Sequence, residues 1–268
     1  MSVSPPVIER VISCRYPSIE ADRFVDAHKR WQDEIGKHGF EQKLVKHWDV
    51  NIPEDPQTHG PDLSNASMTL NEGYHYQKDG NVILRPCRDL FSVNLLGVEN
   101  TSFEKAKQLA GQFIPMWMGM AEIERPSAVQ VVYVDQFTNA HFAPFIDSDG
   151  ILKLDEIFQL PVFCPVGGGA FIPPLHQEFT WTLKENSRAL LSVQLDILPC
   201  PNVDHWLARL MTTTTLLARE QDEFSNETFH KTLMGLHKIH IGAFRKMLTP
   251  EMLKHCGIES LSAERETV

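Results

Sequence analysis

Three segments of the chain alternate apolar and polar residues with a period of two. In 91–95 the apolar residues are Phe91, Val93 and Leu95, and the segments 179–183 and 191–197 show the same alternation. Because successive side chains of a β-strand point to opposite faces of the sheet, each segment is expected to be a strand with one buried face and one wet face. Strands of this kind are typical of an antiparallel sheet that is covered on one side.

The other elements are predicted from hydrophobic spacing and from turn residues. Further strands are expected at 7–16, 44–50, 74–77, 82–84 and 128–137, and helices at 19–38, 103–117, about 203–219 and about 226–247. Asp79-Gly80 supplies the positive φ angles of a tight hairpin turn. Thr101 to Glu104 has the form of a capping box, and Pro115 is expected to bend or end the helix that follows. Thr249-Pro250 predicts the start of a short final helix, which Gly257 should end.

The order of these elements predicts an α+β fold. We expect a largely antiparallel sheet with helices covering one face, a ferredoxin-like first half and a helical C-terminal third. No stretch of linker composition marks a domain boundary, so 1–268 is expected to be a single domain, with a sub-division into 1–137 and 138–268 as the alternative.

Composition narrows the class of protein. The chain has no run of the roughly 18 apolar residues that cross a bilayer, and Met1 to Pro6 lack the pattern of a signal peptide, which predicts a cytoplasmic protein without a membrane partner. The formal net charge of −10 argues against extensive nonspecific binding of nucleic acid. The five cysteines are scattered, with no pair at the spacing of a zinc site. No cofactor is expected.

The last long helix carries three histidines, His230, His237 and His240. Neutral imidazole binds transition metals and can move protons near neutral pH, so His237 and His240 are the candidate catalytic or metal-binding residues. Both also lie on one stripe with Leu233 and Phe244, and no carboxylate stands at the spacing of a HExxH motif. We therefore interpret the two histidines first as packing residues.

Two further regions are candidates for function. Asp135 ends a hydrophobic strand and His141 follows shortly after, so they could form an acid/base pair, although an aspartate at a strand end is commonly a turn former. Met116, Trp117 and Met118 form a hydrophobic cluster that could contact a partner. Flexible methionine side chains adapt to contact surfaces as well as to cores.

Short motifs resemble those of a known family. They are Pro5 to Glu9, Val132 to Phe137, Leu195-Asp196-Ile197, and Leu236-His237 with the closing Leu248 to Glu251. The chain is similar over nearly its whole length to a family of proteins of about the same size, sporadically distributed among bacteria and archaea and without an established activity. Where this family has an Arg and an Asn in its central strand, the chain has Val132 and Asp135. The resemblance implies a single-domain bacterial or archaeal protein, and patchy distribution is compatible with defence or toxin–antitoxin modules.

Three functional hypotheses follow. The residues favour a non-enzymatic binding or regulatory subunit over an enzyme. Such a subunit would act through protein contacts, and a homodimer is one form that it could take. The alternative is a metal-dependent or general acid/base enzyme that uses His237 and His240, with Asp135 or His141 brought near by folding. The third is nucleic-acid binding through a local patch of Arg85, Arg88 and Lys105, which the overall charge disfavours.

Overall fold

The computed structural model describes residues 7–51, 67–97, 102–148, 152–159, 175–184, 186–200, 205–219, 222 and 224–258. The strands are β1 (Val7–Arg15), β2 (Glu41–Asn51), β3 (Ser67–Lys78), β4 (Val82–Pro86), β5 (Leu90–Leu96), β6 (Ala128–Phe137), β7 (Leu175–Leu183), β8 (Asn186–Cys200) and β9 (His205–Leu217). The helices are α1 (Ala21–Lys37), α2 (Phe103–Met120), α3 (Asn139–Phe142), α4 (Asn226–Met247) and α5 (Pro250–His255), with short 3-10 turns at Ala143–Phe145 and Leu154–Glu156.

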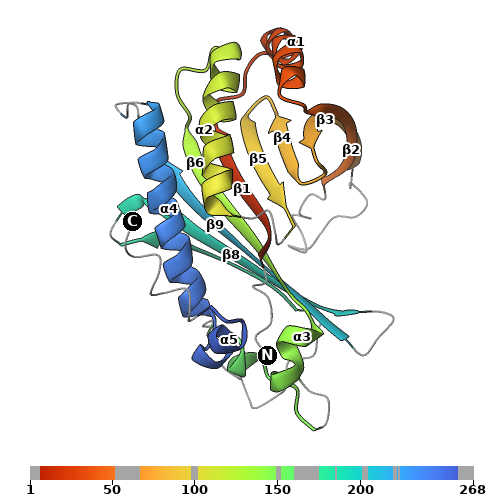
Figure 1. Ribbon diagram of the computed structural model, residues 1–268, viewed down its shortest axis with the longest axis vertical. Helices are drawn as coiled ribbons and strands as arrows, with labels where there is room; N and C mark the ends of the chain where they lie inside the picture. Colours follow the sequence, from red (N-terminus) through yellow and green to blue (C-terminus); the bar gives the residue numbers. More distant parts are fainter. Residues whose placement is uncertain are drawn as a thin grey trace, which may run out of the picture.

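All nine strands form one sheet in the order β2-β3-β4-β5-β1-β6-β9-β8-β7. Every neighbouring pair is antiparallel. Helices α1, α2 and α4 lie against one face of this sheet (Figure 1). The predicted α+β fold, with a largely antiparallel sheet, helices on one face and a helical C-terminal part, is confirmed.

The first half contains the split β-α-β arrangement that a ferredoxin-like fold requires. Strands β4, β5, β1 and β6 are neighbours in that order, and α1 and α2 provide the two crossovers. The hairpin formed by β2 and β3 extends this unit at its outer edge. The second half of the chain has a related order of elements, because β6 is followed by the meander β7-β8-β9 and then by α4. Strand β6 pairs with β1 on one side and with β9 on the other. One continuous sheet therefore contains strands from before and from after residue 137.

Two hydrophobic clusters fill the space between the sheet and the helices. The first is centred on Trp31 of α1 and Trp117 of α2, which meet edge to face with ring centroids 5.7 Å apart. The second lies under the C-terminal end of α4 and includes Phe137, Leu195 and Phe244. Both arise from apolar residues that share one face of a strand or one stripe of a helix, so the helices are held mainly by this burial.

The segment expected to be a helix at 203–219 is a strand, which makes that prediction wrong. Strand β9 covers His205–Leu217 and pairs along its length with β6 and β8. Apolar residues three and four apart suggested a helix, yet Thr212 to Thr215 are β-branched and favour extended backbone. Pairing with β6 and β8 stabilises the extended backbone, so this segment forms a strand.

Helix α2 also differs in detail from the prediction. Its N-cap is Ser102, whose hydroxyl accepts a hydrogen bond from the Lys105 N–H at 3.2 Å, so the cap lies one residue after the expected Thr101. The helix continues past Pro115 to Met120. The proline removes one backbone donor, but the buried side chains on either side of it, Ile114 and Trp117, anchor the helix in the core.

Candidate functional site

A belt of polar side chains crosses the interior between the two hydrophobic clusters. We call it the polar belt, and it consists of Arg10 on β1, Tyr133 and Asp135 on β6, Thr212 on β9, and His237 and His240 on α4. The three central strands bring these groups together, because Tyr133 is paired directly with Arg10 on one side and with Thr212 on the other. The belt therefore gathers three of the residues singled out from the sequence.

His240 is packed inside the belt. Its side chain is 4 % exposed, and its Nδ1 shares a hydrogen bond of 2.8 Å with the Thr212 hydroxyl. Its ring lies flat on the ring of Tyr133. Burial lowers the pKa of His240 well below its usual range, and the nearby His237 and Arg10 lower it further. The imidazole is therefore neutral at pH 7.

His237 lies one helical turn earlier and is partly buried. A short hydrogen bond joins its Nδ1 to the Tyr133 hydroxyl. On the side of α2, its ring stacks on Phe103 with centroids 3.8 Å apart. Burial raises the pKa of the Tyr133 phenol, so this hydroxyl keeps its proton at neutral pH. His237 thus links β6 to the start of α2.

Asp135 is the most unusual member of the belt. The residue is 1 % exposed, and neither carboxylate oxygen has a hydrogen-bond partner within the part of the chain that the structure describes. Burial raises the pKa of its carboxyl to about 8, and the Arg10 guanidinium opposes that rise. A buried carboxyl avoids the large cost of an isolated charge by staying protonated. Asp135 is therefore mainly a neutral acid at pH 7.

Arg10 was not predicted from the sequence. Its guanidinium carbon lies 4.4 Å from the centroid of the Tyr133 ring, a cation–π geometry. The available signal was a pair of adjacent charged residues, Glu9 and Arg10, in the otherwise apolar run Val7 to Ile12, because one of the two must lie on the inner face and a buried charge needs a partner. Which residue it meets depends on the pairing of β1 with β6, which is not visible in the sequence.

His141 has a local structural role. Its Nδ1 accepts a hydrogen bond of 3.1 Å from the Thr138 N–H and so completes the capping box of α3. Its ring meets Phe137 edge to face with centroids 5.7 Å apart. These contacts account for a polar residue that is only 7 % exposed.

Trp117 and its neighbours lie mostly in the core. Trp117 is completely buried, and its indole N–H donates a 2.8 Å hydrogen bond to the Tyr16 hydroxyl. Met118 is 3 % exposed, and Met116 packs against the first cluster while staying partly exposed. In the folded chain, only Met116 of these three has appreciable surface to offer a partner.

The cationic residues considered for nucleic acid do not form one patch. Arg85 is exposed on β4, on the sheet face away from the helices, whereas Lys105 is in the first turn of α2. The third residue, Arg88, donates a 2.9 Å hydrogen bond to the backbone oxygen of Ile19.

The belt lies apart from the two cavities that the described residues line. A cavity of about 540 Å³ is lined by residues such as Arg23, Glu122 and Arg219, and one of about 270 Å³ by residues such as Arg188 and Phe229. No residue of the polar belt lines either cavity. Within the described ranges, no three His, Cys, Asp or Glu side chains are grouped closely enough to hold a metal ion. The belt's observed contacts are those of packing and hydrogen bonding.

Comparison of the chain with protein-family models, with curated proteins and with solved structures gave no match in any of the three. Among the described residues, no helix is both long enough and apolar enough to cross a membrane.

Proposed function

We propose that this protein is a non-enzymatic binding or regulatory subunit that acts through protein contacts, and that the edge strand β7 makes the contact. One observation carries the proposal. On β7 the rings of Phe179 and Trp181 stack with centroids 5.5 Å apart, and Trp181 is 36 % exposed at the end of the sheet. Large aromatic side chains at an exposed strand edge are typical of surfaces that bind another chain.

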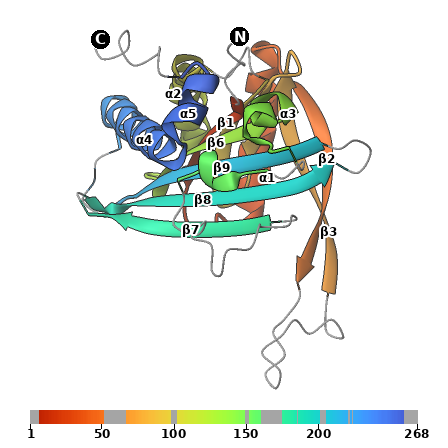
Figure 2. The same cartoon turned by 90° about the horizontal axis from the view of Figure 1, so that it is seen from below.

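The position of β7 supports the proposal. It is the last strand of the sheet, and Figure 2 shows it at the outer side, away from α4 and α5. An edge strand presents unpaired backbone N–H and C=O groups, which a second polypeptide can satisfy by adding a strand. Protein binding at β7 would thus combine backbone hydrogen bonds with burial of the aromatic pair.

The contacts of the polar belt also support the proposal. His237 and His240 are engaged with Phe103, Tyr133 and Thr212, and these contacts connect α4 to the sheet. We further propose that the protein works as a regulatory subunit of a defence or toxin–antitoxin type module. We assign the belt to the scaffold and the contact to β7.

Site-specific photo-crosslinking tests the proposal. A benzophenone amino acid is placed at Thr180 on β7, and in a matched control at Lys43 on the opposite edge strand β2, and both proteins are irradiated in the native cells. We expect a discrete protein adduct from position 180 and none from position 43. Absence of any adduct at position 180, or the same adducts at both positions, would overturn the proposal.

A metal-dependent or general acid/base enzyme is the second candidate, and Asp135 is the observation that favours it. Buried carboxyls with a raised pKa are common in catalytic sites, and the Asp135 carboxyl interacts electrostatically with Tyr133 and Arg10. Metal analysis of untagged protein tests the metal-dependent form of this candidate. Stoichiometric metal that is lost in His237→Ala would favour the enzyme, and its absence in the wild-type protein would count against a metal-dependent one.

A further inference from the structure

The two edges of the sheet differ in how they resist strand addition. Natural proteins protect exposed edges with charged side chains, above all lysine, and with proline. Strand β2 contains Lys43 and Lys46, and Lys43 forms an ion pair of 3.1 Å with Glu41 of the same strand. Strand β7 contains no Lys, Arg or Pro from Leu175 to Leu183. Among the described residues, β7 is therefore the edge strand without lysine, arginine or proline, and Glu178 is its one acidic residue.

The side chains of β7 are sorted by face. Phe179 and Trp181 are paired with Val193 and Leu191 of β8, so they lie on the same face as these buried residues. Thr180 lies on the opposite face and shares a hydrogen bond of 3.1 Å with the Ser192 hydroxyl. The edge thus has one aromatic face and one polar face.

We infer that the partner at this edge is a second copy of the chain, and that β7 pairs antiparallel with its own copy about a twofold axis at Trp181. The inference rests on the proposed function, because it names the partner of the same surface. Two nine-stranded sheets would then join into one continuous sheet. A twofold interface of this kind must be self-complementary, since each residue meets its counterpart in both directions.

The sequence of β7, together with Lys184 in the turn that directly follows it, meets that requirement around Trp181. In this register Glu178 stands opposite Lys184 of the copy, and Lys184 opposite Glu178, so two opposite-charge pairs form. Phe179 stands opposite Leu183, Thr180 opposite Thr182, and Trp181 opposite itself. Apolar, hydroxyl and opposite-charge pairs are the cross-strand pairs that stabilise antiparallel sheets.

Neighbouring registers are poorer. An axis at Thr180 places Glu178 opposite Thr182, and an axis at Phe179 places Trp181 opposite Gln177. In both registers Glu178 and Lys184 no longer stand opposite each other. Glu178 and Lys184 are exposed, and neither forms an ion pair with another described residue, so each has its charge available for the copy.

The interface should be of modest size. Seven paired residues span about 24 Å, at roughly 3.4 Å per residue. Contacts of this extent belong to the small, reversible class of protein interfaces. We expect a dimer that forms and dissociates with protein concentration.

Charge reversal tests the inference and its register together. Sedimentation equilibrium is measured from about 1 µM to about 1 mM for the wild type, Glu178→Lys, Lys184→Glu and the double variant. We expect concentration-dependent dimers for the wild type, a dissociation constant raised roughly tenfold in each single variant by two like-charge pairs, and recovery in the double variant. Lys43→Glu on β2 is the matched control and should leave dimerisation unchanged.

Three results would overturn the inference: a wild-type mass of one chain at every concentration, a dimer insensitive to both single reversals, or a double variant no better than the singles. The outcome is separable from that of the proposed function. If the isolated chain is monomeric while crosslinking at Thr180 captures a different protein, the contact surface stands and the second copy fails as its partner. If neither experiment shows binding, both fail.

Discussion

The ring of His240 lies flat against the ring of Tyr133, with centroids 3.5 Å apart and an angle of 3° between the planes. The same Tyr133 holds His237 through its hydroxyl and Arg10 through its ring face. One side chain at the centre of the sheet therefore joins β6 to β1 and to His237 and His240 of α4. The predictions for the polar belt follow from this arrangement.

Removing the Tyr133 hydroxyl should weaken the attachment of α4. In Tyr133→Phe the ring contacts remain, but His237 loses its partner, so we expect a loss of about 1–2 kcal/mol in the free energy of unfolding. Urea denaturation of Tyr133→Phe, His237→Leu and the double variant forms a mutant cycle. Strictly additive losses would show that the hydroxyl and the imidazole do not interact.

Asp135 should make the protein less stable as the pH rises. Its carboxyl has an ordinary pKa of 3.8 when unfolded and a pKa of about 8 when folded, so the folded state alone holds the proton between these values. Stability from this group is full below pH 3.8 and is lost as the pH rises through 8.

Asp135→Asn removes this dependence, because its amide does not titrate. The stability of the variant relative to the wild type should increase between pH 5 and pH 8 by a few kcal/mol, at about 1.4 kcal/mol per pH unit at most. Urea denaturation across this range measures it. Arg10→Met is a useful control, since loss of the guanidinium should raise the pKa of Asp135 further. A difference between Asp135→Asn and wild type that is independent of pH would show that the carboxyl ionises normally.

His240 should act in the opposite sense at low pH. Its pKa is lowered in the folded state, so below about pH 6.5 the unfolded chain binds a proton that the folded chain does not. The free energy of unfolding of the wild type should therefore decline as the pH falls from 6.5. In His240→Gln this decline should be smaller, by up to about 1.4 kcal/mol per pH unit. His38→Gln, at the half-exposed end of α1, is the control. An equal slope in the wild type and in His240→Gln would contradict the buried, neutral imidazole.

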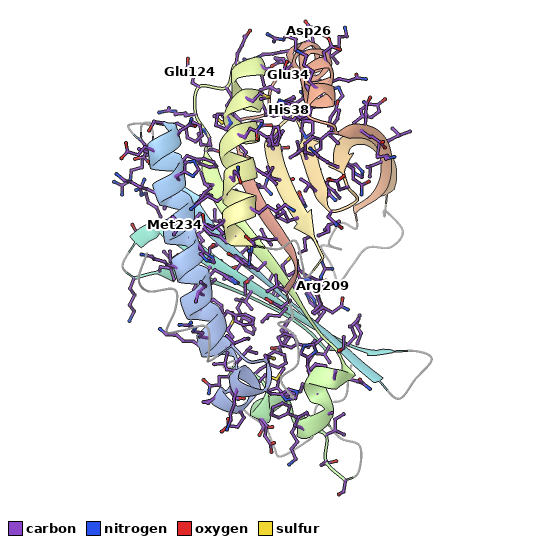
Figure 3. All side chains as sticks on the ribbon, viewed as in Figure 1. Asp26, Glu34, His38, Glu124, Arg209 and Met234 are labelled. Carbon is purple, nitrogen blue, oxygen red and sulfur yellow. The ribbon has the colours of Figure 1, made fainter. Side chains whose placement is uncertain are left out.

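The crossing of α2 and α4 depends on a small residue. A Cβ atom at Gly111 would lie 2.8 Å from the ring of His230, whereas one at Gly119 of the same helix would meet nothing within 4 Å. Elsewhere along the crossing, Lys107 Nζ lies 3.6 Å from the sulfur of Met234, which is labelled in Figure 3. The two helices therefore pack closely at Gly111.

Alanine scanning of these glycines should separate packing from helix propensity. Gly119→Ala should stabilise the protein by up to about 1 kcal/mol, because alanine is the better helix former. Gly111→Ala should gain less or destabilise, since the His230 ring must move, and the double variant Gly111→Ala with His230→Ala should recover the gain. Thermal unfolding measures all three. Equal gains at both glycines would mean that His230 does not pack there.

Much of the fold could be predicted from local patterns. The bounds of α4 agree with the predicted 226–247 because Ser225 caps its start and an apolar stripe from Leu233 to Phe244 runs along it. The hairpin turn at Asp79-Gly80 also agrees, with φ angles of 53° and 71°. In these places local propensity and tertiary packing favour the same structure.

The failures occur where tertiary contacts decide. Strand β9 carries apolar residues at helical spacing, yet its pairing with β6 and β8 makes it a strand. The polar belt is similar, because His237, His240 and Asp135 could be named individually, but their meeting with Arg10 depends on the register of β1 against β6. That register is set by two strands more than a hundred residues apart in the chain.

Hydrogen–deuterium exchange at the two edge strands tests most directly the claim that β7 pairs with a second copy of the chain. Backbone amides of β7 and of β2 are followed by peptide-resolved exchange in dilute and in concentrated protein. We predict slower exchange on β7 at high concentration and unchanged exchange on β2, because pairing of β7 with a second chain protects its outer amides. Exchange on β7 that is independent of concentration, or equal slowing at both edges, would contradict the account.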